Sequence, residues 1–99
     1  MADSRRNGRK RPLEIAREAR KQLAELIGRQ PEGILGVERA NGDDDGGWRV
    51  TLEVLELERV PNSTDLLGCY VAHMDDQGEL VEYQRLRRYQ RGQPDEDMR

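Results

Sequence analysis

One stretch of this chain has the periodicity of a helix, and it constrains the fold more than any other feature. From Leu13 to Ile27 apolar residues recur at steps of three and four, and charged residues fill most positions between them. That spacing is typical of an amphipathic helix. Pro12 suits a first turn, while Gly28 and Pro31 suit the end of a helix. Because a single helix has only one apolar face, the rest of the chain must supply the opposite half of the core.

After Pro31 the pattern changes to short apolar segments separated by glycine, asparagine and aspartate, which indicates strands joined by turns. The expected strands are 34–40, 48–60, 68–74 and 80–89. The segment 61–67 reads as a connection and 75–78 as a hairpin turn. We therefore predict an α+β domain, with an N-terminal amphipathic helix packed on an antiparallel meander of three to four strands.

The longest expected strand changes its pattern partway along. Apolar residues occupy alternate positions from Trp48 to Val54. Leu55 and Leu57 then continue the alternation on the opposite parity. A β-bulge or sharp bend near Leu55 explains this slip, and a strand buried on both faces explains it equally well.

The folded part is expected to be a single domain at 13–92. Both ends are highly polar, so we predict a flexible basic arm at 1–12 and a flexible acidic tail at 93–99. With 37% charged residues and no phenylalanine, the core should be thin. The domain is then a marginal monomer, or one completed by a partner or as a homodimer. Neither a membrane span nor a signal peptide is visible, so the expected location is the cytoplasm.

Residues that would mark a metal site or an active site are sparse. Asp43, Asp44 and Asp45 carry oxygen ligands that suit calcium or magnesium, but they lack the alternating pattern of a calcium loop and read better as a solvated turn. Cys69 and His73 are the only cysteine and histidine, too few for a zinc site of the usual ligand count within one chain. They lie four residues apart on one strand, beyond direct contact, and read as packing residues. We expect no metal and no cofactor.

The long strand carries three glutamates, Glu53, Glu56 and Glu58. Paired carboxylates can serve acid–base catalysis. No histidine, lysine or serine stands at a spacing that would complete a nucleophile or a proton relay. Cross-strand contacts with the arginines of the last strand are the better interpretation, and we predict no catalytic residues.

The last strand is an arginine and tyrosine strip that runs from Tyr83 to Tyr89. Such a composition can stack on bases and neutralise phosphates, and the basic arm adds to it, although the net charge of −3 argues against nucleic acid. Arginine and tyrosine are also enriched where proteins contact proteins, which is the interpretation we prefer. The predicted partner-binding residues are Trp48, Glu53, Glu56, Glu58, Tyr83, Arg85, Arg87, Arg88 and Tyr89.

Three segments of the chain resemble the gas vesicle protein O family, accessory proteins of gas-filled protein shells. They are 48–61 (WRVTLEVLELERVP), 65–70 (DLLGCY) and 80–89 (LVEYQRLRRY). The resemblance implies a cytoplasmic protein needed for vesicle formation, without enzymatic activity or cofactor. Its partners would be other gas vesicle accessory proteins and the small hydrophobic shell protein.

The apolar inner wall of a vesicle makes its subunits prone to aggregate, so a helper that covers apolar surface or pairs through an open sheet edge would be useful. Two alternatives stay open at this point. One is a nucleic-acid-binding regulator of vesicle gene expression, and the other is a minor structural component of the vesicle.

Overall fold

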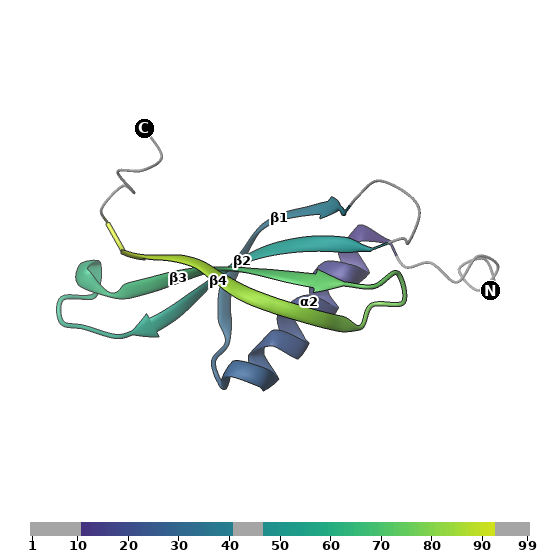
Figure 1. Cartoon of the computed structure of the whole chain (residues 1–99). Coiled ribbons are helices and arrows are strands. Elements are labelled where there is room, and N and C mark those ends of the chain that lie inside the picture. Colours follow the sequence, from purple (N-terminus) through teal and green to yellow (C-terminus); the bar gives the residue numbers. More distant parts are fainter. Residues whose placement is uncertain (1–10, 41–46, 93–99) are drawn as a thin grey trace.

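The computed structural model describes residues 11–40 and 47–92, which form one helix and a four-stranded sheet (Figure 1). Most of the predicted basic arm, nearly all of the aspartate-containing loop and the predicted acidic tail lie outside the described residues. The elements in chain order are α2 (Pro12–Ile27), β1 (Pro31–Arg39), β2 (Trp48–Leu57), the 3-10 turn η1 (Asn62–Thr64), β3 (Leu66–Met74) and β4 (Leu80–Gln90). The predicted α+β class is confirmed.

Helix α2 begins and ends at the predicted signals. The carboxylate of Glu14 accepts a hydrogen bond from the backbone N–H of Arg11 at 2.9 Å, which satisfies one of the unpaired donors of the first turn. At the other end Gly28 has φ of 75°, the left-handed conformation that glycine adopts without a steric penalty. Its N–H bonds the carbonyl of Ala24 at 2.9 Å.

The sheet is an antiparallel meander in the order β1-β2-β3-β4. β1 begins at Pro31, three residues before the predicted start, because a proline can open an edge strand without a ladder donor. β2 ends at Leu57, three residues before the predicted end. Past the end of the ladder, the backbone N–H of Arg59 donates to the Asp65 carboxylate at 2.7 Å.

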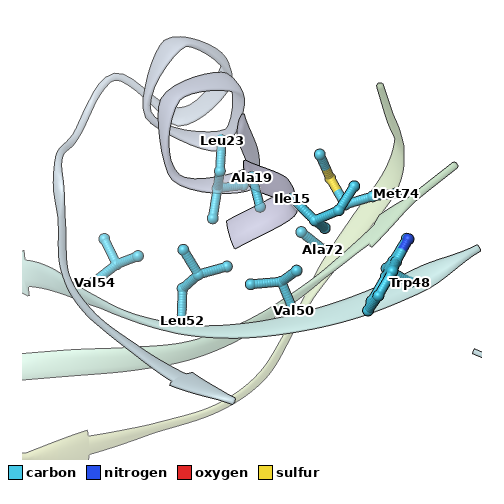
Figure 2. Close-up of a cluster of buried hydrophobic side chains, with 9 residues drawn as sticks. All are labelled: Ile15, Ala19, Leu23, Trp48, Val50, Leu52, Val54, Ala72 and Met74. Carbon is cyan, nitrogen blue, oxygen red and sulfur yellow. The ribbon is translucent and has the colours of Figure 1, made fainter. Parts of the chain in front are cut away.

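The core lies between α2 and one face of the sheet, as Figure 2 shows. Ile15, Ala19 and Leu23 of the helix pack on residues of the two central strands, which are Trp48, Val50, Leu52, Val54, Ala72 and Met74. Trp48 is only 6% exposed, and the guanidinium of Arg39 lies 4.7 Å from its ring centroid. Helix α2 thus packs on the apolar part of this face of the meander, as predicted.

The predicted bulge near Leu55 is confirmed, since the register of β2 against β3 shifts between Leu55 and Leu57. The two edge strands also carry shifts, near Glu32 and Leu35 in β1 and near Val81 and Leu86 in β4. Each shift leaves one residue without a cross-strand partner and bends its strand.

The helix covers only part of its face of the sheet. In Figure 1 the C-terminal ends of β2 and β4 and the start of β3 extend past the helix. This uncovered half of the sheet holds the arginines singled out in the sequence.

Candidate functional site

The arginine and tyrosine strip of β4 is divided between the two faces of the sheet. Arg85 lies opposite Tyr70 and Arg87 opposite Cys69, so Leu86 is an extra residue at a bulge. Successive side chains of a strand alternate between the two faces of the sheet, and an extra residue at a bulge reverses which of the odd- and even-numbered residues face each side. Arg88 therefore joins Arg85 on the helix side, while Arg87 and Tyr89 lie on the far side of the sheet.

On the helix side, beyond the helix, Glu56 is surrounded by three donors. Its carboxylate accepts the hydroxyl of Tyr70 at 2.6 Å, Nε of Arg88 at 2.9 Å and Nη1 of Arg85 at 3.1 Å. We call Glu56, Tyr70, Arg85 and Arg88 the Glu56 cluster. The Glu56 side chain is 9% exposed, whereas those of Arg85 and Arg88 are 42% and 51% exposed. The carboxylate therefore lies beneath the two guanidinium groups.

Gly68 provides the space that the Glu56 cluster occupies. A Cβ atom at this position would lie 2.4 Å from a carboxylate oxygen of Glu56 and 2.9 Å from the Tyr70 ring. Both distances are shorter than van der Waals contact, so a larger residue would displace the carboxylate. The glycine is thus needed for packing rather than for an unusual backbone conformation.

The charge of Glu56 is stabilised by its partners. Burial by itself would raise the pKa of this carboxyl, but the hydrogen bonds from Tyr70, Arg88 and Arg85 outweigh that effect and hold the pKa below its ordinary value. The pKa of the Tyr70 hydroxyl is raised, by burial first and then by the adjacent carboxylate. At neutral pH the cluster therefore contains one carboxylate, two guanidinium groups and a protonated tyrosine.

The far face of the sheet has a second pairing, between the hydroxyl of Tyr89 and the carboxylate of Glu53. Burial and this carboxylate raise the pKa of Tyr89 well above its ordinary value. Cys69 is buried on the same face, and His73 lies 4.0 Å from the carboxylate of Glu82. The predicted pairing of β2 glutamates with β4 arginines is thus confirmed for Glu56, whereas Glu53 is bonded to a tyrosine.

Two other predicted partner-binding residues lie apart from these contacts. Trp48 is buried in the core, where its ring contributes to packing. Glu58 is exposed just past the end of β2. A partner-binding role for the nine predicted residues remains a prediction.

A third polar cluster was not expected from the sequence. Arg91 bonds Asp65 through Nε at 3.1 Å and Glu32 through Nη2 at 2.7 Å, and the Asp65 residue is only 3% exposed. These contacts join the end of β4 to the β2–β3 connection and to the start of β1. The three residues lie far apart in the chain, so no local pattern indicates them.

Among residues 11–40 and 47–92, no three histidine, cysteine, aspartate or glutamate side chains are grouped to hold a metal ion. Asp43, Asp44 and Asp45 lie outside this part of the chain. Nor does the described part of the chain contain a helix with the length and apolar character needed to cross a bilayer.

The described residues form a small α+β domain, with helix α2 over half of an antiparallel meander and ion-paired side chains over the other half. The protein-family model described as gas vesicle synthesis protein GvpO matches residues 1–95 of the chain. The chain therefore belongs to the GvpO family. This agrees with the resemblance in β2, β3 and β4. Its family is thus one of gas vesicle synthesis proteins rather than a known class of enzyme.

Three curated relatives support the assignment. Gas vesicle protein O of Streptomyces sp. is 44% identical over 85% of this chain and 62% of its own length. Gas vesicle protein O of Haloferax mediterranei is 41% identical over 84% and 55% of the two chains, and gas vesicle protein O1 of Halobacterium salinarum is 35% identical over 81% and 64%. The chain spans between about half and two thirds of the length of these relatives. No solved structure matches it.

Proposed function

We propose that this chain is a non-catalytic accessory protein required for gas vesicle formation, and that it acts in the cytoplasm by binding other gas vesicle proteins during assembly. Membership of the gas vesicle synthesis family supports the part of this proposal that concerns gas vesicle formation. The observation that carries the binding role is the Glu56 cluster, because it holds two arginines at fixed positions on a half of the sheet that the helix leaves uncovered.

The contact surface is best placed on the helix side of β4. Tyr83, Arg85 and Arg88 share this side, and Tyr83 is 39% exposed. Tyrosine and arginine contribute strongly to protein interfaces because they combine apolar area with directed hydrogen bonds. Glu56 positions the arginines and Trp48 supports the sheet from the core, so both act through other residues rather than by direct contact.

The proposal can be tested by replacing the protein O gene of a gas vesicle gene set with the gene for this chain or for a variant of it. The set is expressed with its own protein O gene absent, with the wild-type chain, or with the Arg85→Ala, Arg87→Ala, Arg88→Ala triple variant. We expect vesicles, counted by electron microscopy, to need the chain, and vesicle proteins captured on it to be reduced with the triple variant. Normal vesicle yield without any protein O would refute the requirement. Unchanged capture by the triple variant would show that the binding surface lies elsewhere.

The two alternative functions, a nucleic-acid-binding regulator and a structural component of the vesicle, can be tested with the same expressed gene set. A regulator that binds nucleic acid would retain vesicle promoter or transcript fragments in a salt-dependent manner. A structural component would remain on intact vesicles after washing. An assembly factor that leaves the finished shell should show neither property.

A further inference from the structure

We propose that Arg85 and Arg88 form a binding site for a carboxylate, and that its ligand is an aspartate or glutamate side chain in an exposed segment of a partner protein. This inference rests on the proposed protein-binding function and specifies the chemistry of the ligand. It uses the helix-side half of the β4 strip and not Arg87 or Tyr89.

The first support is the order of charges from solvent inward. Arg85 and Arg88 have about half of their side-chain surface exposed, whereas their carboxylate partner Glu56 is 9% exposed. An approaching molecule therefore meets guanidinium groups before it meets the acid that balances them. In an ordinary surface ion pair both partners are hydrated, as in the pair of Arg49 and Glu38, whose side chains are 40% and 62% exposed.

The second support is the donor capacity of the two arginines. A guanidinium has five N–H donors. Arg88 contacts Glu56 through Nε, and Arg85 contacts it through Nη1. Donors on the terminal nitrogens are thus available to a second carboxylate, for which the planar fork of arginine is well matched.

The third support is that the arginines are already held in place. Glu56 is itself fixed by the Tyr70 hydroxyl and packs against Gly68. Binding a ligand with a mobile arginine costs the ordering of a long side chain, and anchoring removes part of that cost. The Glu56 cluster therefore acts as a support that orients two donors outward.

The balance of charge and the neighbouring surface favour a carboxylate over a phosphate backbone. Two arginines and one glutamate leave a net charge of +1 on the cluster, which suits a single acidic side chain. Nucleic acid presents a row of phosphates, and its binding requires several cations along one track. The Tyr83 ring, centred 6.3 Å from that of Tyr70, adds apolar surface on the same side of the sheet.

The test measures binding of a short fluorescent peptide of alternating glutamate and alanine to the purified chain by anisotropy, with a glutamine peptide as the neutral control. We expect Arg85→Ala and Arg88→Ala each to weaken binding of the glutamate peptide about tenfold, from loss of a charged hydrogen bond. Arg49→Ala removes an exposed strand arginine outside the site and should change binding less than about twofold. Circular dichroism and urea unfolding confirm that each variant is folded.

Two further variants distinguish specific binding at the two oriented arginines from non-specific attraction of the glutamate peptide to positive charge. Arg88→Lys keeps the charge but removes the fork, and Glu56→Gln adds positive charge but removes the support. We expect both to bind the glutamate peptide more weakly than the wild type. Full binding by the lysine variant, or tighter binding by the glutamine variant, would overturn the proposal. So would equal binding of the glutamine peptide, or tighter binding of a short single-stranded oligonucleotide that also depends on Arg88.

The same variants distinguish this inference from the proposed function. If capture of vesicle proteins persists with Arg85→Ala and Arg88→Ala but is lost with Arg87→Ala, the carboxylate site is refuted while the assembly role stands. If the glutamate peptide binds as expected but vesicles form normally without the chain, the site stands and the assembly role is refuted.

Discussion

The two halves of the helix-side face of the sheet reach stability by different means. Under α2 the sheet side chains are apolar and buried, as with Leu52 and Ala72. Beyond α2 the same face is filled by the Glu56 cluster, in which the carboxylate is hydrogen-bonded to one tyrosine and two arginines. The covered half supplies the hydrophobic driving force. The uncovered half shows that a sheet can extend past its helix when hydrogen bonds and ion pairs replace the missing layer.

A comparison of lengths explains why the helix cannot cover the whole face. At 1.5 Å per residue, the 16 residues of α2 span about 24 Å. At about 3.3 Å per residue, the 11 residues of β4 span about 36 Å. Even a helix parallel to the strands would leave about a third of the sheet uncovered.

The largest effect should come from the covered half. Leu52→Ala removes a fully buried side chain from the centre of the core, and we expect it to cost about 2–5 kcal/mol of unfolding free energy, measured by urea denaturation. Leu26→Ala is the control, because that leucine is 59% exposed and should change stability by less than about 0.5 kcal/mol. If Leu52→Ala and Leu26→Ala lowered the unfolding free energy by similar amounts, the buried apolar layer would not be the main source of stability.

In the uncovered half, Gly68→Ala places a methyl group against the Glu56 carboxylate. We expect a cost of about 1–3 kcal/mol in the same assay. Gly36→Ala is a matched control, since an added Cβ there meets nothing within 4 Å. In combination with Glu56→Ala, which removes the clash with the carboxylate but not the contact with the Tyr70 ring, the glycine substitution should cost less than it does alone. Strict additivity would show that the two residues do not share the space.

Glu56→Gln tests the charge of the cluster and should cost about 1–2 kcal/mol at neutral pH. The folded-state pKa of Glu56 lies below its ordinary value of 4.5, so its ionisation stabilises the fold above that value. This stabilisation is lost as the pH falls through the folded-state pKa. Unfolding measured from neutral to acidic pH should therefore show the variant losing less stability than the wild type. Parallel curves would contradict the assignment.

The smallest effect is expected on the far face. Tyr89→Phe removes the hydrogen bond to Glu53 and should cost about 0.5–1.5 kcal/mol. Because the folded-state pKa of Tyr89 is raised from 10.0, its contribution is present below that value and lost as the pH rises above it. Stability of the variant should thus fall less at alkaline pH than that of the wild type. Tyr83→Phe, at an exposed tyrosine, serves as the control for loss of a hydroxyl.

The covered half could be predicted from the sequence, and the uncovered half only in part. The alternating pattern from Trp48 to Val54 identifies a strand with one buried face. Its slip at Leu55 leaves a bulge and a strand buried on both faces equally open, and the register shift between Leu55 and Leu57 shows the bulge. β4 is an edge strand with polar residues on both faces, so its bulge at Leu86 leaves no such signal. The division of the arginines between two faces was therefore beyond sequence reasoning.

The bond between Arg91 and Asp65 could not be predicted either. It joins residues 26 positions apart that come together only once the meander has formed. A polar residue in a connection and another after a strand have no common periodicity. Contacts of this kind depend on the tertiary fold and not on local pattern.

The register shifts in both outer strands of the sheet bear on how the protein behaves when many copies are crowded together. A regular outer strand offers a template on which a second chain can add in register, and repeated addition leads to fibrils. The extra residues near Leu35 in β1 and near Val81 and Leu86 in β4 break the spacing of that template at both borders. We expect the protein to remain dispersed at concentrations at which a smooth-edged sheet of the same size would polymerise.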